Sequence, residues 1–184
     1  MEEKYLPEVE DWDAFLAPYS QAIEELKIKL KGIRLQYRQK GKHAPIEFIT
    51  GRVKTPESIR EKMQVRKILT EDFLEGVQDI AGLRIMCQFV DDIFEVVRLL
   101  RQRNDFTIII ERDYIHQKKA SGYRSYHVVL EYPVQRIEGE EKILVEIQIR
   151  TLAMNFWATI EHSLNYKYKG EFPEIIHERL ERAA

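Results

Sequence analysis

The sequence predicts an α+β domain in which a mixed β-sheet is flanked by helices. Segments with apolar residues at steps of three and four, which favour helices, alternate with short stretches rich in Val, Ile and Tyr, which favour strands. Two of these strands are joined by a short turn at residues 138–139 and form a hairpin, so the sheet is not purely parallel. A chain of 184 residues can bury one substantial core, and we expect a single domain over residues 1–184.

Residues 12–40 are predicted to form one long amphipathic helix. Their apolar members recur at steps of three and four, which places them on one side of a helix. Pro18 lies inside this segment, and we expect a break there because proline cannot donate the backbone hydrogen bond. Gly41 follows the last periodic residue and is expected to end the helix.

Residues 46–150 are predicted to hold the sheet and the helices that pack on it. A helix over 55–69 begins with Thr55 as a capping hydroxyl and Pro56 in the first turn, and Asp91 and Asp92 cap a second helix that ends near residue 103. The predicted strands cover residues 46–53, 80–90, 106–115, 125–137 and 143–150. C-terminal helices are expected over 152–184, one to about residue 168 and a short one after Pro173.

Charge is unevenly distributed along the chain although the net charge is only −2. Residues 2–13 are mainly acidic, whereas residues 27–42 carry only basic charges. Such a basic run is either a solvated helix face or a surface that faces the phosphates of nucleotides or RNA.

Several classes of protein and site are not expected. The chain has no apolar run of about 18 residues and no secretory signal, so we expect a cytoplasmic protein without a membrane partner. Cys87, the only cysteine, lies in an apolar stretch, which excludes a disulfide within the chain and favours a buried thiol. The histidines lack the spacing of zinc ligands, and His162 and His177 are interpreted as helix-face residues; the full set is His43, His116, His127, His162 and His177.

Basic and hydroxyl side chains gather at the start of the helix over 55–69. Arg52 and Lys54 precede this helix, and Ser58 and Lys62 are four residues apart, so that they share one of its faces. Free backbone N–H groups, the positive end of the helix dipole and two ammonium groups suit a polyphosphate. An ordinary basic helix on the surface is the alternative.

Two carboxylates are associated with predicted strands. Asp79 precedes the strand over 80–90, and Glu146 lies inside the last strand with Gln148 and Arg150 on the same face. An unpaired carboxylate is costly to bury, so Glu146 faces solvent or a metal ion. Two carboxylates brought together by the sheet would hold Mg²⁺, with water and phosphate oxygens completing its coordination. The alternative, Glu146 on an exposed edge hairpin, is weakened by Arg84, which supplies a cation near Asp79.

Residues 118–127 form a loop that leads into a strand. Gly122 provides flexibility, and Tyr123, Ser125 and His127 alternate onto one side as the strand begins. Tyrosine can stack on a purine, lysine can bind phosphate and short polar side chains can orient a ligand. A surface loop rich in Lys and Tyr is the alternative.

Four motifs, in this order along the chain, resemble the synthetase domain of the RelA/SpoT homologue family. They are Arg52-Val53-Lys54 with Ser58 and Lys62, the stretch 79–86, the loop 119–127, and the stretch 146–151 followed by a helix with Trp157 and His162. Within the family, the chain is most similar to the stand-alone small alarmone synthetases of the RelQ type. The resemblance implies a nucleotidyltransferase-like fold and an enzyme that moves pyrophosphate from ATP to the 3′-hydroxyl of GTP or GDP, releases AMP and has no hydrolase activity.

The resemblance also implies a role for each matching residue. Arg52 and Arg84 would sandwich the adenine of ATP, and Lys54, Ser58 and Lys62 would bind its phosphates. Asp79 and Glu146 would hold Mg²⁺, and Glu146 is favoured as the base that accepts the hydroxyl proton. Tyr123 would stack on the guanine, with Lys119 and His127 on the phosphates of the acceptor and Gln148 and Asn155 near its base and ribose.

Relatives of the RelQ type are homotetramers with a central cleft that binds the alarmone product as an activator, and some bind single-stranded RNA. Lys27, Lys31, Phe48 and Thr50 are the candidates for such a cleft, because they come from the basic helix and the strand after it. The alternative is that Phe48 belongs to the core and the two lysines are solvated.

The chain also departs from its relatives at two places. Longer members carry an RxKD or ExDD signature linked with GDP or GTP preference, and the matching stretch here, residues 110–113, is Ile-Glu-Arg-Asp, so the preferred acceptor stays open. Small members usually continue into further C-terminal helices, so we expect a truncated C-terminus.

Two other functions fit the same residues less well. A catalytically silent regulator that binds nucleotides or RNA would not need both carboxylates and the stacking tyrosine. A different metal-dependent nucleotidyltransferase would typically show clustered carboxylates after a Gly-Ser turn, and this motif does not occur.

Overall fold

A five-stranded sheet with strand order β1-β2-β5-β4-β3 forms the centre of the molecule. The computed structural model describes residues 3–117, 119, 121–168 and 174–183. The strands are β1 Phe48–Val53, β2 Ala81–Cys87, β3 Thr107–Asp113, β4 Tyr126–Arg136 and β5 Gly139–Thr151. β2 and β5 pair in parallel and the other neighbours pair antiparallel, which confirms the predicted mixed sheet.

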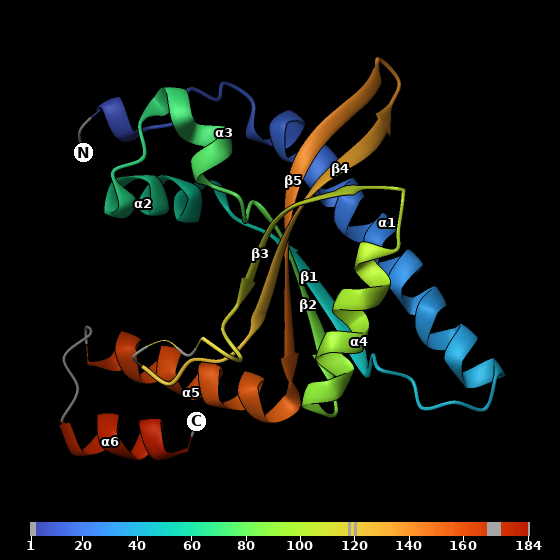
Figure 1. Ribbon diagram of the computed structural model, residues 1–184. Helices are drawn as coiled ribbons and strands as arrows, with labels where there is room; N and C mark the ends of the chain where they lie inside the picture. Colours follow the sequence, from blue (N-terminus) through green and yellow to red (C-terminus); the bar gives the residue numbers. More distant parts are fainter. Residues whose placement is uncertain (1–2, 118, 120, 169–173, 184) are drawn as a thin grey trace.

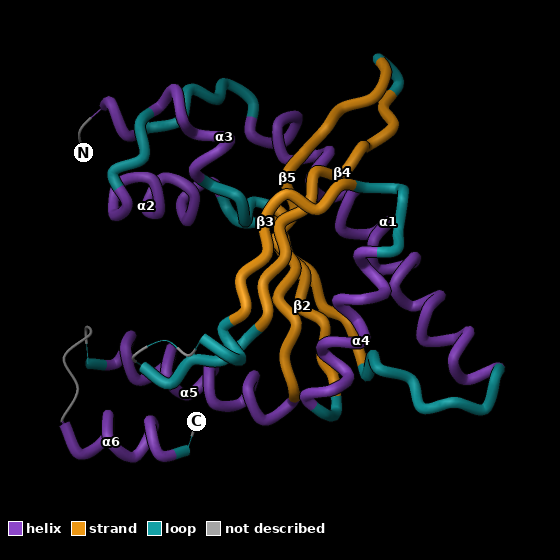
Figure 2. Tube along the Cα trace, in the orientation of Figure 1, coloured by secondary structure: helices purple, strands orange, loops and turns teal. Residues whose placement is uncertain are grey.

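The helices lie on both sides of this sheet (Figure 1). α1 (Trp12–Gln39) and α4 (Val90–Arg101) cover one face. On the other side, α2 (Pro56–Arg66) and α3 (Phe73–Gly76) lie toward one end of the strands, and α5 (Leu152–Lys167) and α6 (Glu174–Arg182) toward the opposite end, as the tube in Figure 2 also shows. Two short 3₁₀ helices, η1 (Glu3–Tyr5) and η2 (Thr70–Asp72), complete the elements.

The core lies between the sheet and helices α1 and α4. Alternate residues of the strands point to this side, as Leu83 and Ile85 of β2 and Ile147 of β5 show by their complete burial. α1 approaches β1 closely at Gly51, where an added Cβ would lie 2.6 Å from Cγ2 of Ile23. The neighbouring residues of each strand therefore point to the opposite face, which is available for polar side chains.

Two expectations about helices were wrong in detail. α1 continues through Pro18 without a break, because Pro18 and its neighbour Tyr19 are buried and packing holds both sides of the proline in the helix. α4 is not capped by Asp91 and Asp92. Instead Phe89 is the N-cap residue, and the carboxylate of Asp92, inside the first turn, accepts a hydrogen bond from the Phe89 backbone at 3.0 Å.

The start of α2 follows the predicted pattern. The Thr55 hydroxyl accepts a hydrogen bond from the Ser58 backbone at 3.3 Å, and Pro56 occupies the first turn. The helix ends at Arg66, before the predicted end, because Lys67 adopts a left-handed conformation with φ of 53°. None of the helices in the described ranges is long and apolar enough to cross a membrane.

Candidate active site

Polar side chains form a row across the open face of the sheet. The strand register places Thr50 opposite Arg84, Arg84 opposite Gln148, Gln148 opposite His127 and His127 opposite Arg112. Because paired residues point to the same side of a sheet, these five side chains share one face. In the next row Gly82 separates Arg52 from Glu146 and, having no side chain, leaves open space between them.

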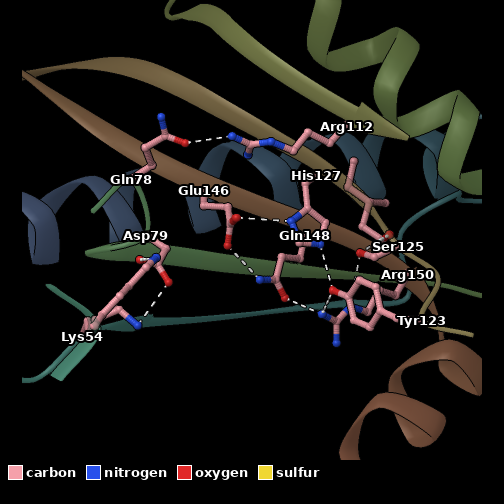
Figure 3. Close-up of polar contacts among 12 residues, drawn as sticks. Lys54, Gln78, Asp79, Arg112, Tyr123, Ser125, His127, Glu146, Gln148 and Arg150 are labelled. Carbon is pink, nitrogen blue, oxygen red and sulfur yellow. Dashed lines mark hydrogen bonds and ion pairs between the residues drawn. The ribbon is translucent and has the colours of Figure 1, made fainter. Parts of the chain in front are cut away.

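Asp79 lies at one end of this face and pairs with two lysines (Figure 3). Its carboxylate lies 3.1 Å from Nζ of Lys54 and 2.6 Å from Nζ of Lys62. Lys54 lies beside Asp79 because β1 and β2 run antiparallel. Their pairing extends one residue beyond the strands, where the backbone N–H of Lys54 donates to the carbonyl of Ile80 at 2.8 Å. Burial alone would raise the pKa of Asp79, but the hydrogen bonds and charges of the two lysines outweigh it and lower this pKa.

Glu146 lies in β5, the central strand, and not on an edge hairpin. Its side chain is only 15% exposed. Nδ1 of His127 lies 3.2 Å from one carboxylate oxygen, and Nε2 of Gln148 donates to the other at 2.8 Å. Burial would raise the pKa of Glu146, but these partners lower it to about 2, so the carboxylate is ionised at neutral pH.

The two carboxylates line one hollow of about 240 Å³. Its lining residues are Thr50, Gly51, Arg52, Asp79, Gly82, Leu83, Arg84, Glu146 and Gln148. Among the described residues, no three His, Cys, Asp or Glu side chains group as ligands of one metal ion. Two ionised carboxylates nevertheless fit Mg²⁺, which commonly binds one or two carboxylates and takes its other ligands from water and phosphate.

A second hollow of about 380 Å³ adjoins the first and shares Arg52 and Arg84 with it. It is further lined by Tyr123, Arg150, Ala158, Thr159, Glu161, His162 and Ser163. Burial and the nearby charges of Arg150 and Arg52 lower the pKa of Arg84. Arg52 and Arg84 have no ion pair with any residue that the structure describes, so their guanidinium groups are available to a ligand.

The loop before β4 brings Tyr123 to the edge of the second hollow. Gly122 adopts a left-handed conformation with φ of 87°, which allows the chain to turn there. Nζ of Lys119 lies 5.0 Å from the centre of the Tyr123 ring and 4.6 Å from that of Tyr114. Lys118 and Ala120 of the predicted loop lie outside the described residues, as does the side chain of His177.

Most of the predicted site residues come together on this face. Arg52, Arg84, Asp79, Glu146 and Gln148 line the first hollow, with Lys54, Lys62, His127 and Tyr123 in direct contact with members of the site. Ser58 lies at the start of α2, close to Lys54 in sequence. The cation expected beside Asp79 was Arg84, but Lys54 and Lys62 form its ion pairs.

Asn155, Lys27 and Lys31 do not line either hollow. Asn155 lies in α5, and its buried side-chain oxygen has no hydrogen-bond partner in the described part of the chain. Lys27 pairs with Glu24 on α1, which packs on the opposite face. Phe48 is 44% exposed, which removes the alternative that it belongs to the core.

The sequence did not predict roles for His162 and Arg150. His162 was interpreted as a helix-face residue, and it lies on the face of α5 that lines the second hollow with Arg52 and Arg84. For Arg150, the sequence showed only that it shares a strand face with Glu146 and Gln148. Its position two residues after Gln148 was the signal that could have placed it in contact with the site.

Paired lysines on one carboxylate, a second ionised carboxylate and an adjacent hollow lined by arginines are typical of enzymes that transfer phosphate groups between nucleotides. The model of the "Region found in RelA / SpoT proteins" matches residues 51–171. The chain belongs to the RelA/SpoT family.

Its relatives are similar over nearly the whole chain. GTP pyrophosphokinase YjbM of Bacillus subtilis is 62% identical over 173 residues, which cover 94% of this chain and 82% of the relative. The crystal structure of small alarmone synthetase 1 from B. subtilis bound to its product pppGpp superposes with a TM-score of 0.88 at 61% identity, covering 94% of this chain and 88% of that one. The same synthetase bound to AMPCPP gives a TM-score of 0.80 at 56% identity, covering 94% and 87%.

Proposed function

We propose that the protein is a GTP pyrophosphokinase, which transfers the pyrophosphate of ATP to the 3′-hydroxyl of GTP or GDP and releases AMP. The observation that carries this proposal is the position of Glu146, an ionised carboxylate in the central strand. It lies in one hollow with Asp79, next to the arginines of a second hollow and linked through His127 to Tyr123. The relatives bound to pppGpp and to AMPCPP support the two kinds of nucleotide.

Arg52 and Arg84 suit the adenine of ATP. They lie on neighbouring antiparallel strands in diagonal positions, because Arg52 is opposite Gly82. Diagonal side chains start about 7–8 Å apart. This matches two stacking separations of about 3.5–4.0 Å each, so a flat base fits between the two guanidinium planes.

The phosphates of ATP would meet Lys54, Lys62 and Ser58 at the start of α2. In the structure both lysines are held by Asp79, and Lys54 lies just before the first turn of α2, the positive end of the helix dipole. When ATP binds, phosphate oxygens would compete for the lysines and release the Asp79 carboxylate. Asp79 and Glu146 would then hold Mg²⁺, which, when bound, supplies positive charge that neutralises the transferring phosphates.

Transfer requires the acceptor 3′-oxygen to attack the β-phosphorus of ATP in line. A bond forms from this oxygen to the β-phosphorus, the bond from the β-phosphorus to the bridging α–β oxygen breaks, and AMP leaves with its electron pair. Glu146 would accept the hydroxyl proton, because it lies in the hollow between Asp79 and the acceptor residues and its carboxylate carries no proton of its own. Tyr123 would stack on the guanine and Lys119 would meet the acceptor phosphates.

The decisive experiment incubates the purified chain with Mg²⁺, γ-labelled ATP and either GTP or GDP, and separates the products by anion exchange. Label in a guanosine tetra- or pentaphosphate, with equimolar AMP, supports the transfer and identifies the acceptor. No transfer to either acceptor by a folded protein that binds both nucleotides would instead favour the silent regulator. A Glu146→Gln variant that binds nucleotides but keeps substantial turnover would exclude Glu146 as the base.

We also propose a homotetramer with a product-binding cleft and a cytoplasmic location, where ATP and GTP are available. Thr50 and Phe48 point to the open face, whereas Lys27 and Lys31 belong to α1 on the other side, so a cleft with all four needs more than one copy. Sedimentation would give the number of copies. A sigmoidal progress curve that becomes linear on addition of alarmone supports the activator, and filter binding tests single-stranded RNA.

A further inference from the structure

Arg150 is a buried arginine that contacts three of the polar side chains labelled in Figure 3, Tyr123, Ser125 and Gln148. It lies in β5 and is only 5% exposed. Its Nη2 donates to the hydroxyl of Tyr123 and, at 2.7 Å, to Oε1 of Gln148, and its Nε donates to Oγ of Ser125 at 3.3 Å. No carboxylate among the described residues pairs with it, so its interactions are with neutral groups that it orients.

Two arms run from Arg150 and meet at Glu146. In one arm, the Tyr123 hydroxyl lies 2.8 Å from Nε2 of His127, and Nδ1 of His127 lies 3.2 Å from Oε1 of Glu146. In the other, Nε2 of Gln148 donates to Oε2 of Glu146 at 2.8 Å. The five side chains therefore form a closed ring of hydrogen bonds.

The chemistry of Arg150 and Glu146 fixes the direction of every hydrogen bond in this ring. A guanidinium group only donates and an ionised carboxylate only accepts. The Tyr123 oxygen accepts from Arg150, so its single hydrogen is free to point to Nε2 of His127. Because Nε2 accepts that hydrogen, it must be bare, and the neutral ring of His127 carries its own hydrogen on Nδ1, where it faces the carboxylate of Glu146.

We propose that Arg150 is a positioning residue that fixes His127 as the Nδ1–H tautomer and holds Glu146 and Tyr123 in one hydrogen-bonded ring. The roles of Glu146 as base and Tyr123 as guanine platform rest on the proposed function. The ring then couples binding of the guanine to removal of the hydroxyl proton, because Tyr123, which stacks on the guanine, also orients Glu146 through His127. His127 acts on Glu146 and is not free to bind the acceptor phosphates in this arrangement.

The first test is spectroscopic and does not depend on activity. The full chain is labelled with ¹⁵N-histidine, studied above the pKa range of histidine, and the His127 signals are assigned from a His127→Gln variant. We expect a protonated Nδ1 and a bare Nε2 in the wild type, and loss of this preference in Arg150→Lys, which keeps the charge but not the fork of donors.

Arg101→Lys is the matched control, because Arg101 also donates to a tyrosine hydroxyl and to a carboxylate, those of Tyr126 and Glu111, outside the ring. This variant should leave the His127 signals unchanged. A wild-type His127 with its hydrogen on Nε2, or an unchanged Nδ1–H signal in a folded Arg150→Lys variant, would overturn the proposal.

The second test is a kinetic cycle with Tyr123→Phe, which keeps the stacking ring and removes only the hydroxyl. Each of Arg150→Lys and Tyr123→Phe is expected to lower kcat by about 10–100-fold, because a misplaced general base loses part of its rate contribution. Tyr123→Phe should leave the KM for the acceptor nearly unchanged, since the stacking ring is kept. Because both variants break the same link, the double variant should be no slower than the slower single one. Fully multiplicative losses would contradict the ring, and a wild type with the expected tautomer but no transfer activity would refute only the proposed function.

Discussion

Replacing Asp79 by asparagine removes the only negative charge that pairs with both Lys54 and Lys62 in the described structure. The two lysine side chains are 12% and 16% exposed, so water replaces the lost partner poorly. Asparagine keeps the size of the side chain, but its single amide oxygen can accept from only one of the two lysines, and its NH2 group would face the other ammonium group. Asp79→Asn is therefore expected to leave two neighbouring buried charges uncompensated.

The expected loss of stability is roughly 2–4 kcal/mol. Hydrogen bonds to charged groups contribute about 1.5–3 kcal/mol each, and removal of one partner of a buried pair costs about 3–5 kcal/mol when burial is complete. For a chain of this size, about 2–4 °C is lost per kcal/mol, which gives a decrease in Tm of roughly 5–15 °C. Urea unfolding and calorimetry of both proteins would measure it.

Glu131→Gln is the matched control, since it makes the same chemical change in an exposed pair with Lys142. It should leave Tm unchanged within error. The pH dependence provides a second check. The pKa of Asp79 is lowered on folding, so its stabilisation is complete above the ordinary carboxyl pKa of about 4 and is lost as the pH falls through the folded value. An Asp79→Asn variant as stable as the wild type would refute the idea that Asp79 neutralises the lysines.

Three further predictions concern the two nucleotides and the packing of the sheet. Tyr123→Ala should raise the KM for GTP or GDP about 10–100-fold in steady-state kinetics, which is the value of one base–aromatic stack, and should leave the KM for ATP unchanged. An effect on the KM for ATP alone would contradict the assignment of Tyr123 to the guanine. His162→Ala should raise the KM for ATP more than that for the acceptor, because His162 shares its hollow with Arg52 and Arg84, which both belong to the proposed adenine site, and with Tyr123 of the acceptor site; equal effects on both would count against it. Gly51→Ala should lower the free energy of unfolding by about 1–3 kcal/mol, because its Cβ would lie 2.6 Å from Ile23. Gly82→Ala, with its nearest atom at 3.9 Å, should keep its stability, and equal urea midpoints would contradict this difference.

Local sequence patterns predicted the elements and which side chains share a face. The alternation in β5 placed Glu146, Gln148 and Arg150 together, and Thr55 with Pro56 marked the start of α2. These features depend on neighbours in the chain, and the structure confirms them. Pro18 shows the limit of such patterns, because the burial of Pro18 and Tyr19 outweighs the missing hydrogen bond.

Contacts between distant segments could not be predicted in the same way. The pairing of Lys54 with Asp79 depends on the antiparallel register of β1 and β2, and the burial of Glu146 depends on β5 lying in the centre of the sheet. The position of His162 depends on how α5 packs against the strands. Each of these is a property of the strand order or of helix packing, which no single segment of sequence contains.

The central claim is that an intact pyrophosphate group moves from ATP to a guanosine nucleotide. A ³¹P NMR spectrum of the protein with Mg²⁺, ATP and GTP or GDP tests it most directly, because each reaction of ATP leaves different phosphorus signals. We predict that AMP and a 3′-diphosphate on the guanosine nucleotide appear together in equal amounts while ATP is consumed. Release of ADP with phosphate, of AMP with free pyrophosphate, or an unchanged spectrum from a folded protein that binds both nucleotides would contradict the claim.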